Sequence, residues 1–177
     1  FFDTKDIRST GSNVGSVELN RLYETYLNTN FLRRGYPYSF NADINGDFFI
    51  RTLEGSEDEA IEADYSWVHF SLSAPKFLEG QEVYIYGKFN NYQLTDENKM
   101  YFNPGLEIYE GIILLKQGFY NYKYVAKSSD QLLTNSLSDS HALTENRYLI
   151  LVYYSEFGTR NDALIGIGKA SSFEILD

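Results

Sequence analysis

The second part of the chain consists of short apolar segments separated by turn residues, and this rhythm limits the folds open to it. From Tyr65 onward the segments are YSWVHFSL, EVYIYG, KMYFN, IYEGIILL, GFYNYKYVAK, RYLILVYY and ALIGIGKASSFEI. Turn signals such as Gly80, Asn103-Pro104-Gly105 and Lys116-Gln117-Gly118 stand between them. Short strands at a spacing of about ten residues are typical of a β-sandwich. The pattern therefore predicts an all-β fold.

Alternation within these segments predicts which faces are buried. In YSWVHFSL, Val68 and Phe70 fall on one side of the strand, and Trp67 and His69 fall on the other. One side is then expected to pack on a second sheet. The segment Tyr148–Tyr154 is apolar on both sides, which predicts a central strand.

The first third of the chain is less regular. FFDTKDIRSTGSNVGSV at the start is predicted to be an extended tail, interrupted around Gly11 and Gly15. The segment SVELNRLYETYL fits either an amphipathic helix or a hairpin that turns at Asn20 and Arg21. We favour the hairpin because every neighbouring segment is β.

An acidic segment, Glu54–Asp64, separates the irregular part from the regular part. It holds six carboxylates in eleven residues and no apolar period, as in a solvated loop. We therefore predict a β-rich N-terminal segment over 1–62 and a sandwich over 63–177.

Composition agrees with a sheet protein and excludes several functions. Aromatic residues make up 17% of the chain, which suits pleated, half-buried surfaces. Cys is absent, so disulfides, cysteine-based zinc sites and a thiol nucleophile are excluded. A net charge of -10 argues against binding to a phosphate backbone. No apolar run approaches the ~20 residues of a transmembrane helix.

The run EVYIYGKFNNYQLTDENKMYFNPGLEIYEGIILLKQGFYNYKYV, Glu82 to Val125, resembles the glycogen-binding type of carbohydrate module. Strand, glycine, Phe-Asn-Asn-aromatic corner, YEGIILL and YNYKYV follow one another in that family's order. The resemblance implies an early-set, immunoglobulin-like β-sandwich.

A second resemblance covers nearly the whole chain. FFDTKDIRS, DINGDFFIR, ADYSWVHFSL, YGKFNNYQL, LLKQGFYNYKYV and TENRYLILVYYSEFGTRNDALIG are similar, in this order, to the C-terminal portion of the type IX secretion system plug proteins of Bacteroidetes. The resemblance implies a periplasmic protein without enzyme activity or cofactor. It also implies a partner, an outer-membrane β-barrel translocon that the plug blocks when no cargo is present. Members of that family are longer and carry an export signal and an upstream β-domain, so we expect this chain to be a fragment.

The aromatic corner raises an alternative function, glucan binding, either as a free-standing module or as an accessory domain of a polysaccharide-processing enzyme. Glycogen-binding modules stack corner tryptophans on sugar rings and orient the sugar with Lys and Asn. Here the corner ring is Tyr92, Lys123 matches the family's lysine, and the chain's one tryptophan, Trp67, lies on another strand. Because most of the ligand half of the motif is missing, we predict that the corner turns the chain.

A calcium loop is a weaker possibility. Asp43, Asn45, Asp47 and Glu54 follow the ligand order of such a loop, but Phe48 stands where the loop needs glycine. A hairpin turn at Asn45-Gly46 is favoured.

The chain shows no signature of a zinc or catalytic centre. His69 and His141 are its two histidines and have no metal-ligand spacing. A Gly-x-Ser-x-Gly elbow and a phosphate loop are both missing from the sequence. We predict no metal site and no catalytic residues.

Two surfaces are candidate interfaces. Tyrosine is enriched at binding centres, and long loops often carry contacts, so the polar loop Ser128–Asn146 is one candidate. The other is a pair of tyrosine-rich strand faces, although packing against the second sheet would account for half of these residues: Tyr84, Tyr86, Tyr120, Tyr122 and Tyr124.

Overall fold

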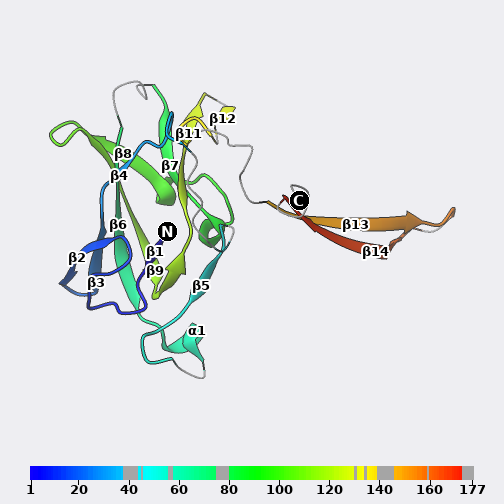
Figure 1. Ribbon diagram of the computed structural model, residues 1–177, viewed down its shortest axis with the longest axis horizontal. Coiled ribbons are helices and arrows are strands. Elements are labelled where there is room, and N and C mark those ends of the chain that lie inside the picture. Colours follow the sequence, from blue (N-terminus) through cyan, green and yellow to red (C-terminus); the bar gives the residue numbers. More distant parts are fainter. Residues whose placement is uncertain are drawn as a thin grey trace. The chain divides into compact units, whose positions relative to one another are not determined.

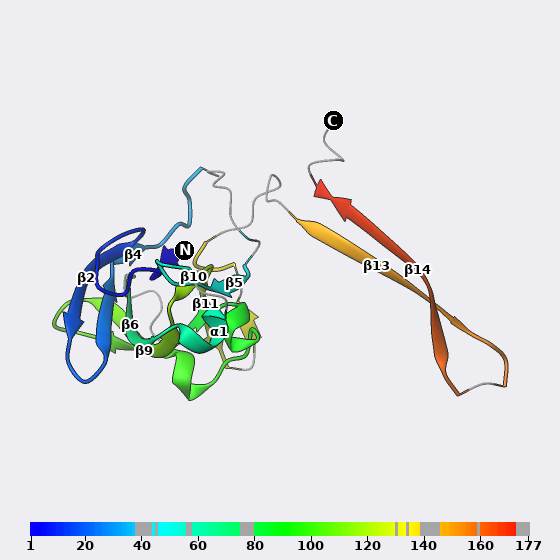
Figure 2. The ribbon, with the colours of Figure 1, turned by 90° about the horizontal axis from the view of Figure 1, so that it is seen from below.

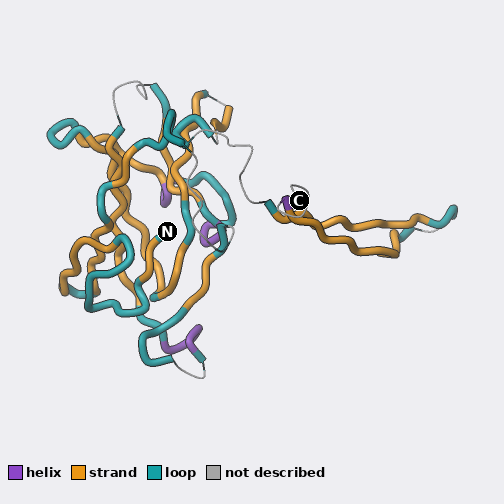
Figure 3. The backbone as a smooth tube through the Cα atoms, in the orientation of Figure 1, coloured by secondary structure: helices purple, strands orange, loops and turns teal. Residues whose placement is uncertain are grey.

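The computed structural model describes residues 1–37, 44, 46–55, 58–74, 80–129, 131–133, 135–138, 146–158 and 160–172. They belong to two compact units, Phe1–Pro37 with Asn41–Asp139, and Tyr38–Phe40 with Ser140–Asp177. Strands are the main regular secondary structure of both units (Figure 1, Figure 3). The all-β prediction is confirmed.

The first unit holds twelve of the fourteen strands described. They are β1 (Phe2–Asp3), β2 (Val14–Leu19), β3 (Tyr23–Leu27), β4 (Asn30–Phe31), β5 (Phe48–Ile50), β6 (Tyr65–Ser73), β7 (Glu82–Tyr86), β8 (Lys99–Asn103), β9 (Ile108–Lys116), β10 (Gly118–Tyr120), β11 (Lys123–Ser128) and β12 (Gln131–Leu133). A four-residue helix, α1 (Glu59–Glu62), and two 3-10 helices, Lys88–Asn90 and Asp96–Asn98, lie between them. None of the described helices is long and apolar enough to cross a membrane.

One strand, β8, joins the two halves of the main sheet. The sheet order is β12-β11-β7-β8-β9-β6-β3-β2, and β4 also pairs with β6. Lys99 and Met100 of β8 pair with β7, whereas Tyr101–Asn103 pair with β9. A strand that changes partners along its length lets a sheet fold over on itself. The two halves thereby enclose one core.

The core is built from the inward sides of both halves. Val68 and Phe70 of β6 are buried, as are Ile85 of β7 and Ala126 of β11, in one apolar cluster. The alternation read from YSWVHFSL is therefore confirmed, since Val68 and Phe70 are 1% exposed and Trp67 is 38% exposed.

The start of the chain is part of this core, which corrects two predictions. Strand β1 pairs with β10, and β10 pairs with β5, in a separate three-stranded sheet. Phe2 of β1 is 0% exposed. The start is therefore a strand of the core and no tail, and the boundary expected between 62 and 63 does not separate the compact units.

The hairpin predicted over SVELNRLYETYL is confirmed. Strands β2 and β3 are antiparallel, and the Asn20 amide donates to the Leu22 carbonyl at the turn (Figure 2). Its place in the sheet is less expected, because β3 runs parallel to β6, with Thr25 opposite Val68. Residues before and after the acidic segment thus share one sheet.

The segment predicted as one strand, GFYNYKYVAK, forms two. It breaks at Asn121-Tyr122, so that β10 and β11 belong to different sheets. The two strands have different partners, because β10 pairs with β1 and β5 whereas β11 pairs with β7.

The second unit is a hairpin, β13 (Arg147–Ser155) and β14 (Asp162–Ser171), with a register shift at Val152/Tyr153 (Figure 2). Every residue of β13 is exposed, and among the described residues the sheet has two strands. The prediction of a central strand here is wrong. Apolar residues on both sides of this strand remain exposed to solvent.

Candidate functional site

The aromatic corner after β7 is a tight reversal of the chain. Strand β7 ends at Tyr86, and a Cβ atom on the following Gly87 would lie 2.9 Å from the Asn121 carbonyl oxygen, so only glycine fits. One 3-10 turn later, Asn91 and Tyr92 have φ values of 53° and 56°. Left-handed conformation is uncommon for a bulky residue. The backbone from Gly87 to Tyr92 therefore has the conformations that a tight turn requires.

Two side-chain amides, Asn98 and Asn90, hold the corner closed. The Nδ2 atom of Asn98 donates to the carbonyls of Ile85 and Gln93, at 2.7 and 2.8 Å. The Nδ2 atom of Asn90 donates to the same Ile85 carbonyl at 2.9 Å. Asn98 is 2% exposed, and its Oδ1 atom accepts from the Thr95 amide. These contacts take the place of backbone pairing where the strand has ended.

Replacing Asn98 with Ala is expected to lower the free energy of unfolding by about 2–3 kcal/mol, because the Gln93 carbonyl loses its side-chain donor, the Thr95 amide loses its acceptor, and the Ile85 carbonyl keeps only the donor from Asn90. Gln93→Ala is the control: its side chain is exposed, and a change within about 0.5 kcal/mol is expected. Urea denaturation followed by circular dichroism measures both. Equal effects of the two substitutions would show that the amide does not hold the corner.

The structure brings the two predicted sugar-binding residues together through a third. The Tyr92 ring lies 5.2 Å from the Tyr86 ring, and Tyr86 is the cross-strand partner of Lys123. The Lys123 ammonium donates to the Asn135 Oδ1 atom at 3.3 Å. Burial lowers the pKa of Lys123. Two rings and an ammonium therefore share one region beside the corner.

An unpaired amide lies near the same corner. Asn121 is 5% exposed, and among the described residues neither its Nδ2 nor its Oδ1 atom has a hydrogen-bond partner. Its backbone amide donates to the Asp47 carbonyl, and its own carbonyl packs against Gly87. A buried amide without partners is costly, and a ligand or water usually satisfies such a group.

The calcium-loop residues give no support for a metal. The Asp47 carboxylate accepts from the Lys88 ammonium at 2.6 Å and from the Phe48 amide at 2.8 Å. The hydrogen bond from Lys88 holds the pKa of Asp47 below its usual value. Asp43 and Asn45 lie outside the described residues. Within the part of the chain that the structure describes, no group of three metal-ligating side chains occurs.

The exposed tyrosine faces expected as interfaces are mostly buried. Tyr120 is 1% exposed, Tyr84 is 5% exposed and Tyr124 is 8% exposed. Tyr122 and Tyr86 are partly buried. Packing against the rest of the sandwich accounts for these residues, since Phe2 contacts the Tyr120 and Tyr122 rings. The prediction that Tyr84, Tyr120 and Tyr124 are interface residues is therefore wrong.

Buried tyrosines should make the protein sensitive to alkali. Burial raises the pKa of Tyr122 to about 12 and also raises the pKa of Tyr124. Above pH 10 the unfolded chain releases these protons while the folded chain keeps them, so stability falls as pH rises. For Tyr122 alone, a loss on the order of 2 kcal/mol is expected by pH 12. Urea midpoints between pH 8 and pH 11 should decrease, and less steeply in Tyr122→Phe. A flat profile would contradict the burial.

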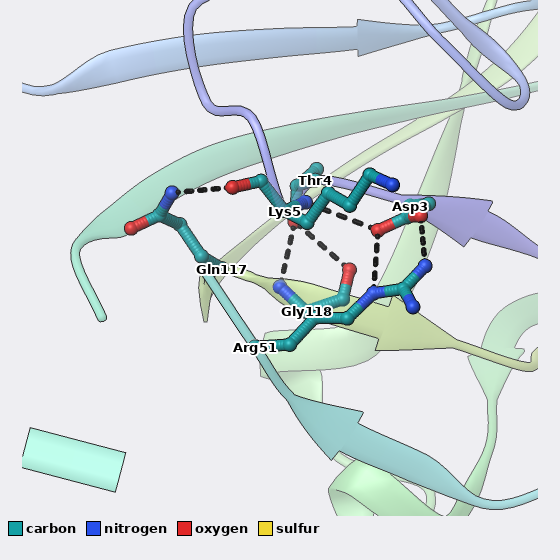
Figure 4. Close-up of polar contacts among 6 residues, drawn as sticks. All are labelled: Asp3, Thr4, Lys5, Arg51, Gln117 and Gly118. Atoms are coloured by element: carbon teal, nitrogen blue, oxygen red, sulfur yellow. Dashed lines mark hydrogen bonds and ion pairs between the residues drawn. The ribbon is translucent and has the colours of Figure 1, made fainter. Parts of the chain in front are cut away.

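A polar cluster that the sequence did not reveal fixes the N-terminal strand (Figure 4). The Asp3 carboxylate pairs with the Arg51 guanidinium, which lies over the Phe49 ring at 5.0 Å. The Thr4 hydroxyl donates to the Gly118 carbonyl and accepts from its amide. Gln117 donates to the Lys5 carbonyl and accepts from the Asp64 amide. These contacts are structural, since most of them tie a side chain to the backbone of another segment.

The side of β6 that faces away from the core is unusually apolar. Trp67 lies opposite Leu114 of β9, and His69 lies opposite Ile112. The exposed fractions are 38% for Trp67, 39% for Leu114 and 50% for Ile112. The sequence placed Trp67 and His69 on this side but gave no sign that β9 would add two aliphatic residues beside them.

Glu24 and Tyr26 of β3 border these residues, and both contact His69 of β6. The His69 Nε2 atom lies 2.6 Å from Glu24 Oε2, and the His69 ring stacks on Tyr26 at 4.1 Å. Burial and the carboxylates of Glu18 and Glu24 raise the pKa of Tyr26. His69 is therefore a sheet-face residue, as predicted, and His141 lies outside the described residues.

The chain is similar to a protein of known structure. No protein-family model matches the chain, and no curated protein matches it. It is similar to the crystal structure of a hypothetical protein from Parabacteroides merdae ATCC 43184, with 34% sequence identity and a TM-score of 0.83. The alignment covers 94% of this chain and 42% of that chain. The chain thus spans less than half the length of the protein that it resembles.

Proposed function

We propose that the chain is a non-enzymatic binding and gating module of a type IX protein secretion translocon, a plug protein that acts in the periplasm at the inner face of the outer membrane. Six motifs in the order of the plug family support this function. The 34% identity with a protein from Parabacteroides merdae also supports it, because that organism is a Bacteroidetes member, as are the sources of the plug family. The observation that carries a binding role is the exposed hairpin β13–β14.

The hairpin exposes apolar side chains on both of its faces. Leu149 and Leu151 are 61% and 42% exposed, and Ile150 on the opposite side is 55% exposed. On β14, Ile165 and Ile167 are both 63% exposed. Contiguous exposed apolar surface marks an interaction site, and a two-stranded hairpin is marginally stable without further packing. A protein partner that covers the hairpin would stabilise it.

The test is affinity purification from envelope extracts of cells that produce the tagged protein. A large outer-membrane β-barrel in near-equal amount is the expected product. Leu151 and Ile167 are cross-strand partners, so Leu151→Ser with Ile167→Ser should lower the recovery at least tenfold. Leu106→Ser, at an exposed turn of the first unit, is the matched control and should leave it unchanged. Recovery of no outer-membrane barrel would refute the plug function.

Glucan binding is the second candidate function, and the Tyr86 ring that joins Tyr92 to Lys123 beside the corner favours it. The ammonium would bind sugar hydroxyls while the Tyr92 ring stacks on a pyranose face. Calorimetric titration with maltoheptaose should then give a saturable signal that Tyr92→Ala removes. Absence of a signal with the unaltered protein would eliminate this candidate.

A further inference from the structure

The outward side of β3, β6 and β9 combines an apolar centre with an aromatic border. We call this surface the outer face and define it by six residues: Tyr26, Tyr65, Trp67, His69, Ile112 and Leu114. All six lie on the side of the sheet opposite the buried Val68 and Phe70. In a sheet with one buried side, the other side is normally polar. Solvent alone does not account for apolar residues on both sides of β6 and β9.

The residues of the outer face are neighbours across the strands. Glu24 of β3, Trp67 of β6 and Leu114 of β9 form one row, and Tyr26, His69 and Ile112 form the next. Directly opposite side chains on one face lie about 5 Å apart. The apolar centre is therefore continuous, and the hydrogen bond between His69 and Glu24 fixes one side of it. Trp in such a surface, with Tyr beside it, is typical of a binding hot spot.

Carboxylates dominate the border of the outer face. Glu18 lies opposite Glu24 on the β2 side, and Glu110 lies on the same side of β9 as Ile112. The one lysine of the border, Lys116, donates to the Ala60 carbonyl, and its ammonium lies 5.2 Å from the Tyr65 ring centre. The border is therefore acidic, and a complementary partner surface carries basic side chains.

The same charges argue against a second copy as the occupant. A two-fold interface places the same patch on both partners, so Glu18, Glu24 and Glu110 would meet their own copies or one lysine. The chain as a whole carries a net charge of -10, which adds repulsion between copies.

We propose that the outer face is a protein-docking surface whose partner presents aliphatic or aromatic side chains bordered by arginine or lysine. This surface is separate from the hairpin that carries the proposed function. The inference therefore does not require the partner to be a secretion translocon.

Site-specific photo-crosslinking in the cells that produce the protein tests the proposal. In the test variant, benzoylphenylalanine replaces Ile112 in the centre of the outer face. In the control variant it replaces Leu106, which is 63% exposed on the β8–β9 turn. Position 112 should give a product with a second protein, and mass spectrometry should place the link next to arginine or lysine residues. Position 106 should give no such product.

Two substitutions probe the two parts of the surface. Leu114→Gln, which removes apolar area from the centre, and Glu18→Lys, which reverses one border charge, should each lower the yield of the crosslink about tenfold. Both positions are exposed, so the thermal unfolding midpoint should stay within a few degrees of the parent protein. A yield unchanged in both variants would overturn the proposal.

The identity of the molecule crosslinked to position 112 also tests the proposal. A link to a second copy, to the β13–β14 hairpin of the same chain, or to a partner segment without basic residues would overturn it, as would the absence of any product. Trp67 is the chain's one tryptophan, so its emission should shift to the blue when the purified partner is added, and no shift would count against the proposal.

The outcome is separable from that of the affinity purification. If the barrel is recovered but position 112 forms no product, the docking surface is wrong and the plug function stands. If position 112 links to a basic protein other than a barrel and no barrel is recovered, the plug function fails and the docking surface stands.

Discussion

Replacing Phe2 with Ala is expected to lower the free energy of unfolding by about 3–5 kcal/mol, although the residue lies one position from the start of the chain. Phe2 is 0% exposed, and its ring contacts the rings of Phe70, Tyr120 and Tyr122 at centroid distances of 5.1 to 5.7 Å. The substitution opens a cavity where the two halves of the sheet and the small β1-β10-β5 sheet meet. A whole domain is stable by about 5–15 kcal/mol, so a loss of this size should be visible as a large shift of the urea midpoint.

Phe1 supplies the matched control for this prediction. Its ring stacks on Phe119 at 5.1 Å, but the residue is 48% exposed. Phe1→Ala should lower the free energy of unfolding by less than about 1 kcal/mol, because the Phe1 side chain buries little apolar area on folding. If the two substitutions had equal effects, the N-terminal strand would not be part of the core.

Gly118→Ala is expected to cost at least about 2–3 kcal/mol, because the site has no room for a methyl group. A Cβ atom at Gly118 would lie 2.4 Å from the backbone oxygen of Phe49 and 3.2 Å from the Cα atom of Ile50. Both neighbours are backbone atoms of β5, so neither can turn aside as a side chain can. The strand pair β10–β5 would have to separate, and the hydrogen bonds between Thr4 and Gly118 would be disturbed.

Gly11→Ala is the control that separates two causes of destabilisation at Gly118, the loss of a glycine and the lack of space for a methyl group. A Cβ atom at Gly11 would meet nothing within 4 Å. The free energy of unfolding should change there by less than about 1 kcal/mol, in either direction. Thermal unfolding of the two variants side by side measures the difference, and similar midpoints would contradict the close approach at Gly118.

The site could be predicted only in part. The corner after β7 was identified from its sequence, and Tyr92 and Lys123 do lie in one region, because Tyr86 joins them. The tyrosine faces were misjudged, since alternation separates two sides of a strand but does not say which side another sheet covers. The outer face was missed for the same reason. Trp67 and Leu114 are 47 positions apart, and only the pairing of β6 with β9 brings them together.

Local pattern determined the strands of this protein, and tertiary structure determined their neighbours. Alternation and turn residues are sufficient for β6, β7, β8, β9 and the β2–β3 hairpin, because pleating and turn geometry depend on adjacent residues. They are insufficient for β13, where residues apolar on both sides suit a buried central strand as well as an exposed hairpin. They are also insufficient for β1, a strand of two residues whose burial depends on β10, more than a hundred positions later. Partners distant in sequence decide which apolar residues become core and which remain available for binding.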